Sequence, residues 1–222
     1  MIAWKYNMDF INLLQKWYKN NKECSFILDN VDNPGWNLLI NGEKNKQIFQ
    51  FDYIDEGTPL RIVDELNPLV NNDNWIVINA NETSFDAVCG RINFPDLIYH
   101  FVKWLDFEEI PLNFRDGFLH FLQKWFFIKF AIQSLEYRGE LWAIDLAWDN
   151  HGTGMTLKTI DDFAWELIID GEYDKSEINI SIGNEMQNDW LTIEANDKDF
   201  KATCSNNRLP EMINYWIKWE DI

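Results

Sequence analysis

Large apolar side chains recur along the chain with the spacing of an amphipathic helix. Between residues 10 and 18 they fall one, three, four, seven and eight positions after Phe10, which places them on one helical face. Residues 118–126 repeat this spacing, and nothing interrupts it before Gly139. Shorter apolar stripes follow Pro95 and Pro210, where a proline in the first helical turn costs no hydrogen bond. The pattern therefore predicts four helices.

The segments between these helices are typical of short strands. Two pairs of apolar runs are interrupted by Asn81-Glu-Thr and by Asn196-Asp-Lys, which are hairpin signals. We expect strands at residues 36–41, 47–53, 75–80, 84–89, 165–169, 190–195 and 200–204. Strands flanked by helices at both ends predict an α+β fold, in which helices pack on one face of an antiparallel sheet.

The same pattern occurs twice. Residues 75–104 align with residues 190–219 at a constant offset of 115, with 11 identities in 30 positions. The first helices match at an offset of 108, and the strands that begin near Trp36 and Trp165 match at 129. Copy two is therefore 21 residues longer before that strand, and copy one is 14 residues longer after it. An internal repeat of this kind predicts two tandem copies of a small antiparallel-sheet domain, at 1–108 and 109–222, each with an N-terminal and a C-terminal helix.

Composition and charge narrow the class of protein. Aromatic residues make up 16% of the chain, which lets each half bury a core despite its small size. Eight tryptophans fall at matched positions of the two copies, and we expect core packing for them. The formal net charge is −18, with −8 in residues 1–110 and −10 in residues 111–222. Such a field repels nucleic acid and anionic membranes, and it speeds encounter with a basic partner.

Several features predict a cytoplasmic protein. No stretch approaches the length of a membrane span, and the first residues do not have the pattern of a signal peptide. The three cysteines do not form a disulfide framework, and Cys89 and Cys204 occupy equivalent apolar strands. Buried thiols of this kind fit a reducing compartment.

Catalytic and metal-binding patterns are absent from the sequence. His100 and His120 are each replaced in the other copy, and His151 lies in a polar loop without evident metal ligands. Phosphate-binding loops, nucleophile elbows and paired cysteine motifs do not occur. We therefore expect no enzyme activity, no metal and no cofactor. A hydrolase centred on His151 is one alternative, and a peptide or small-ligand binding module with a cleft between the copies is another.

Two motifs resemble those of a known family. Copy one carries Leu14-Gln-Lys-Trp17-Tyr18, followed by Asp32-Asn-Pro-Gly-Trp36. Copy two carries a looser stretch, Trp148-Asp-Asn-His151, and has no Asn-Pro-Gly before its equivalent Trp165. This order resembles the immunity protein 53 family of bacterial polymorphic toxin systems. The resemblance implies a cytoplasmic immunity protein that binds and silences a cognate toxin by occlusion, without catalysis. An acidic inhibitor suits a basic toxin such as a nuclease.

The copies differ most where copy one has its extra residues and at the junction between them. Both places are rich in carboxylates, and we expect these to contribute to binding the toxin. The predicted partner-binding residues are Asp52, Asp55, Glu56, Asp64, Glu65, Asp106, Glu108 and Glu109.

Overall fold

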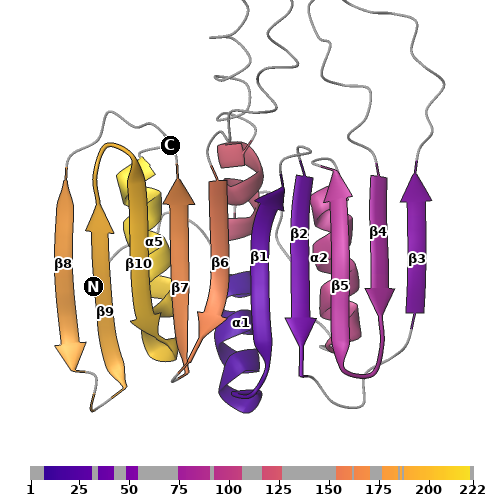
Figure 1. Ribbon diagram of the computed structural model, residues 1–222, viewed down its shortest axis with the longest axis horizontal. Helices are drawn as coiled ribbons and strands as arrows, with labels where there is room; N and C mark the ends of the chain where they lie inside the picture. The colour runs from indigo at the N-terminus through magenta and orange to yellow at the C-terminus, as the bar shows by residue number, and fades with distance from the viewer. Residues whose placement is uncertain are drawn as a thin grey trace, which may run out of the picture. The chain divides into compact units, whose positions relative to one another are not determined.

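The computed structural model describes residues 8–31, 35–42, 49–54, 75–90, 93–106, 117–126, 154–161, 163–170, 177–184, 186 and 188–220. The chain divides into two compact units (Figure 1). Unit 1 contains residues 1–25 and 110–222, and unit 2 contains residues 26–109.

The described residues of unit 2 form a five-stranded sheet and one helix. Its elements are β1 (Ser25–Val31), β2 (Gly35–Asn41), β3 (Phe49–Ile54), β4 (Trp75–Ala80), β5 (Ser84–Gly90) and α2 (Phe94–Trp104). The strand order is β3-β4-β5-β2-β1. Helix α2 packs on β5, β2 and β4, so one face of this sheet is covered by a helix (Figure 1).

Unit 1 has the same kind of sheet with more helices. Its elements are α1 (Asp9–Asn20), a helix at 118–126, β6 (Gly154–Ile160), β7 (Ala164–Asp170), β8 (Ile178–Asn184), β9 (Asp189–Ala195), β10 (Asp199–Ser205), the 3₁₀ helix η4 (Asn206–Arg208) and α5 (Leu209–Glu220). The strand order is β6-β7-β10-β9-β8, and α5 packs on β10.

The two sheets share both strand order and register. Trp36 lies opposite Cys89 in unit 2, and Trp165 lies opposite Cys204 in unit 1. The helix contacts also repeat: the rings of Phe85 and Trp104 are 5.5 Å apart, and those of Phe200 and Trp219 are 5.4 Å apart. The expected α+β class and the tandem duplication are therefore confirmed.

Register also locates the extra residues of copy one. Phe49 lies opposite Ala80 in unit 2, and Ile178 lies opposite Ala195 in unit 1, so β3 and β8 keep the offset of 129. The offset falls to 115 only at β4 and β9. The 14 additional residues of copy one therefore fall between β3 and β4, within 55–74.

Helix α1 packs with residues of copy two, although it belongs to copy one by sequence. The centre of this packing is Asn206, which is 1% exposed. Gln15 Nε2 donates to the Asn206 carbonyl at 2.6 Å, and Asn206 Nδ2 donates to the Gln15 carbonyl at 2.9 Å. Trp165 Nε1 donates to Asn206 Oδ1 at 2.7 Å, and Tyr18 packs edge-on against Trp165. The packing units thus divide the chain differently from the repeat copies at 1–108 and 109–222.

The predicted hairpins and helices form where the pattern places them. Asn81 Oδ1 accepts hydrogen bonds from the backbone of Thr83 and Ser84, and Asn196 Oδ1 does the same in copy two. Three strands were not expected from the sequence: β1, β6 and β8. Their apolar residues still alternate, with Phe26 and Leu28 buried in β1 and Met155 and Leu157 buried in β6.

Candidate partner-binding surfaces

The cysteines are buried, His100 and His120 are half-buried, and they do not form a cluster within the described segments. Burial lowers the pKa of His100, against the opposing effect of Asp96, and His151 lies outside the described residues. Burial raises the pKa of the Cys89 and Cys204 thiols, which is typical of inert core cysteines. Within the described segments, no group of histidine, cysteine and carboxylate side chains could hold a metal ion.

Two of the predicted acidic residues fall on described positions. Asp52 lies in β3, where its backbone pairs opposite Val77. Asp106 is exposed directly after α2 and has a positive φ of 59°, a conformation that aspartate tolerates. The other six, Asp55, Glu56, Asp64, Glu65, Glu108 and Glu109, lie outside the described residues.

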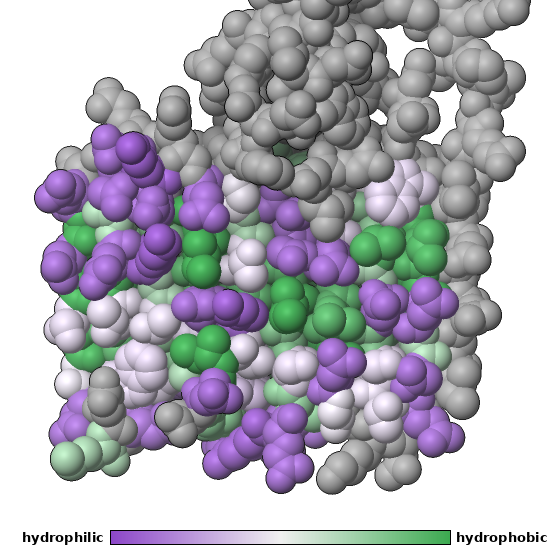
Figure 2. Space-filling view, in the orientation of Figure 1, coloured by the Kyte–Doolittle hydropathy of each residue, from purple (hydrophilic) through white to green (hydrophobic). Residues whose placement is uncertain are grey.

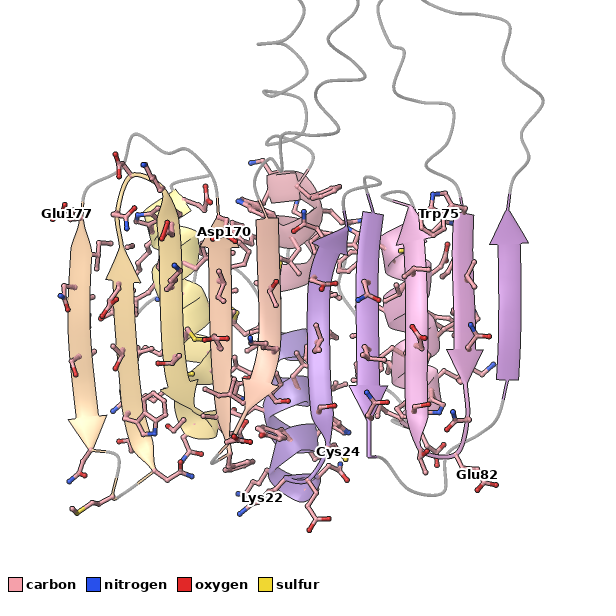
Figure 3. All side chains as sticks on the ribbon, viewed as in Figure 1. Lys22, Cys24, Trp75, Glu82, Asp170 and Glu177 are labelled. Carbon is pink, nitrogen blue, oxygen red and sulfur yellow. The ribbon has the colours of Figure 1, made fainter. Side chains whose placement is uncertain are left out.

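One matched tryptophan pair departs from the expected core packing. Trp36 and Trp165 are fully buried, but Trp75, at the start of β4 (Figure 3), and its equivalent Trp190 are only half-buried. Trp190 lies at a shallow hollow of 380 Å³, whose lining comprises Ser181, Ile182, Gly183, Asn184, Met186, Trp190 and Thr192. Trp75 and Trp190 therefore lie on the sheet face away from the helices and not in the core.

The helix-free face of unit 2, hereafter the open face of unit 2, is partly apolar. On β4 and β5, Val77 lies opposite Val88, and both are half-buried. On β1 and β2 the half-buried residues Ile27 and Leu39 belong to the same face, because the alternate residues Leu28 and Leu38 are buried in the core. Figure 2 shows hydrophobic groups over β4–β5 and over β1–β2 on this face.

Carboxylates interrupt these apolar groups. Asp86 is exposed on β5, opposite Leu39. Asp29 on β1 is half-buried, and this burial raises its pKa although the Asn37 side chain donates a hydrogen bond to it. Among the described residues, neither Asp29 nor Asp86 has an ion-pair partner.

The corresponding face of unit 1 is more polar, although it keeps the half-buried Ile168 at the position of Leu39, and both of its lysines pair with carboxylates. Lys158 on β6 lies opposite Glu166 on β7, and their charged atoms are 2.7 Å apart. Lys201 on β10 pairs with Asp199 at 3.1 Å, and both Glu194 and Asp170 add to the raised pKa of Lys201. Figure 3 shows Asp170 at the end of β7 and Glu177 next to the start of the edge strand β8, with β10 and β9 between them.

The difference between the copies at Asp29 is visible in the sequence. The segment matched at the offset of 129 begins at Asp32 and Asp161, three residues after Asp29. Extended upstream at the same offset of 129, it places Asp29 opposite Lys158, which is a reversal of charge at equivalent positions. The signal needs the presence of strands β1 and β6, and neither was predicted.

Comparisons with known proteins agree with the resemblance found in the sequence. None of the helices within the described segments has the length and apolar character of a membrane span. Neither the curated proteins nor the solved structures include a match to this chain. The family model for immunity protein 53 matches residues 11–106 and 140–221, one segment in each copy. The chain therefore belongs to the immunity protein 53 family.

Proposed function

We propose that this protein binds a cognate basic toxin in the bacterial cytoplasm and neutralises it by covering its active surface. The observation that carries the proposal is membership of an immunity protein family, with the family pattern present in both copies. The described residues supply binding surfaces of suitable kind: sheet faces with exposed carboxylates and half-buried aliphatic side chains. Inhibition by occlusion requires a complementary surface and no bond chemistry.

The charge of the chain supports a basic toxin, such as a nuclease. A net charge of −18 creates a negative field over both copies. Opposite charge on two proteins speeds their association and makes the association rate fall as salt is added. A basic toxin would therefore be captured quickly, which suits an inhibitor that must act before the toxin reaches its target.

The acidic residues that distinguish the two copies contribute to this binding. Asp52, Asp55, Glu56, Asp64 and Glu65 lie in or near the segment where copy one has its extra residues, and Asp106, Glu108 and Glu109 lie at the junction between copies. Asp106 is exposed, as a partner-binding residue must be.

Co-expression with the toxin encoded by the adjacent gene tests the function. We expect cells to grow when both proteins are made, and the purified proteins to form a complex whose association rate falls with ionic strength. Neutralising the eight acidic residues to Asn or Gln should slow association and flatten this salt dependence. A matched control neutralises eight exposed acids elsewhere. Failure of the wild-type chain to bind or protect would refute the proposal.

A further inference from the structure

The geometry points to the open face of unit 2 as the surface that contacts the toxin, through a basic region of the toxin that also carries aliphatic side chains. This inference rests on the proposed function and adds a location to it. The surface consists of four half-buried aliphatic residues and two carboxylates: Ile27, Leu39, Val77, Val88, Asp29 and Asp86.

The duplication supplies an internal comparison. Both units have the same strand order and register, so each position on one open face has an equivalent on the other. Val77 and Val88 lie opposite each other in unit 2, and their equivalents Thr192 and Thr203 lie opposite each other in unit 1. Ile27 is likewise replaced by Thr156. The fold itself therefore accepts threonine at these three positions, whereas Leu39 has an aliphatic equivalent, Ile168.

The charged residues at equivalent positions of the two open faces also differ. Asp29 and Asn37 of unit 2 correspond to Lys158 and Glu166 of unit 1, which form an ion pair. Asp86 corresponds to Lys201, which pairs with Asp199. Unit 1 thus pairs both lysines of its open face with carboxylates, and the exposed Asp170 and Glu194 lie near Lys201 as well. Among the described residues, Asp29 and Asp86 of unit 2 have no such cationic partner.

The arrangement of these groups fits a protein partner. Half-buried aliphatic side chains beside desolvated charges are typical of an interface, where apolar area supplies affinity and charge selects the partner. Asp29 is half-buried and its Oδ1 has no hydrogen-bond donor among the described residues, so a cation that reaches the exposed part of this carboxylate would pair with it in a partly dry environment. Arginine and lysine on the toxin would meet this requirement.

The same charges argue against self-association through this face. Two copies placed with their open faces of unit 2 together would bring Asp29 and Asp86 of one chain against carboxylates of the other. Like charges in a desolvated contact are strongly unfavourable. A basic partner is therefore the occupant that the chemistry selects.

Residue exchange between the two faces tests the inference. In unit 2, Asp86→Lys combined with Val88→Thr installs the residues that unit 1 carries at the same places. The matched control in unit 1 is Lys201→Asp combined with Thr203→Val. With the purified toxin domain of the adjacent gene, the unit 2 variant should lose about 10-fold or more in affinity. The unit 1 variant should stay within about 2-fold of wild type, because the inference places its face outside the contact.

The outcomes are separable. If the wild-type chain does not bind the toxin, the proposed function fails. If wild type binds and the unit 2 variant binds equally well, this inference is overturned while the proposed function stands. Equal losses in both variants, or a loss confined to unit 1, also overturn it. Asp86→Lys alone changes only an exposed side chain, so its binding decides the matter if the double variant has a lowered thermal unfolding midpoint.

Discussion

At the scale of single residues, a buried polar side chain in the core has its hydrogen-bond partners, whereas a carboxylate on the open face of unit 2 is only partly satisfied. Asn206 is fully buried, but its side chain and its carbonyl all have partners in Gln15 and Trp165. Asp29 is different: its carboxylate is half-buried on an open face with one amide donor, Asn37. A group whose charged form is disfavoured by folding reduces stability at neutral pH, so binding is the reason we assign for its presence.

The stability effect of Asp29 should depend on pH. Its pKa in the folded protein is raised above the ordinary value of 3.8 by burial. Stability associated with this group is fully present below that ordinary value and is lost as pH rises through the raised value. Asp29→Asn should therefore stabilise the protein near pH 7, by less than about 1 kcal/mol because solvent screens a half-exposed charge, and the gain should vanish at acid pH.

Urea unfolding of wild type and variant across this pH range measures the difference. Asp86→Asn, an exposed carboxylate on the same face, controls for the change in net charge. A gain from Asp29→Asn that is constant down to acid pH would contradict the assignment, because it would show that ionisation is not the cause.

At the scale of elements, the edge strand β8 depends on one glycine. Gly183 has a φ of +90°, and a β-carbon placed there would lie 1.8 Å from the carbonyl oxygen of Asp189. No side-chain movement relieves this contact, since the obstacle is backbone. Gly183 lies opposite Trp190 near the end of β8 and lines the hollow beside it.

Gly183→Ala should therefore destabilise unit 1 locally by roughly 2 kcal/mol or more, because it adds strain at a positive φ and a backbone clash. Gly154→Ala is the matched control: it has an ordinary φ, and the nearest atom to its β-carbon would be 3.8 Å away. Thermal unfolding and hydrogen exchange of the β8 amides measure both. Equal behaviour of the two variants would show that the turn relaxes without cost.

An element could be predicted from the sequence when its apolar spacing or its turn residues formed a clear local pattern. The helices and the two hairpins were predictable, because long apolar stripes and Asn turns are local signals. Strand β1 was not, because Asp29 and Asn30 interrupt a short apolar run and are typical of turns. Strand β8 alternates Ile178, Ile180 and Ile182 with polar residues, which is the period of a strand, although β8 is not among the predicted strands.

The binding surface could not be predicted from local sequence patterns. Net charge predicts a partner of opposite charge but no surface, since 37 carboxylates are spread over the chain. The open face of unit 2 is defined by which residues share one side of a sheet, and that requires the register of Val77 with Val88 and of Leu39 with Asp86. Such pairing joins residues far apart in sequence, so local patterns cannot supply it.

At the scale of the whole molecule, unit 1 is discontinuous in sequence. Helix α1 is the first element of the chain, but its buried residues pack in a unit that otherwise begins at residue 110. Six of its side chains are at most 2% exposed: Phe10, Ile11, Leu13, Leu14, Trp17 and Tyr18. Copy two therefore takes part of its core, and one hydrogen-bond partner of Asn206, Gln15, from copy one.

A fragment of residues 110–222 should consequently be unstable, and joining residues 1–25 to it through a flexible linker should restore cooperative unfolding. Burial of each large apolar side chain stabilises the fold by roughly 1.5–3 kcal/mol. Loss of α1 therefore removes more stabilising free energy than the net stability of a small domain. Circular dichroism during thermal unfolding measures this. A linked segment with Leu14→Asp and Trp17→Asp is the control, and it should not rescue.

This discontinuity has a consequence for synthesis. The ribosome produces α1 first, yet the strands and the 3₁₀ turn that receive it appear only after residue 154. Residues 26–109 form a unit of their own and can acquire their structure during that interval. For most of translation the nascent chain therefore displays an apolar helix without its binding site, and a chaperone that shields such helices would protect the newborn protein until its last third emerges.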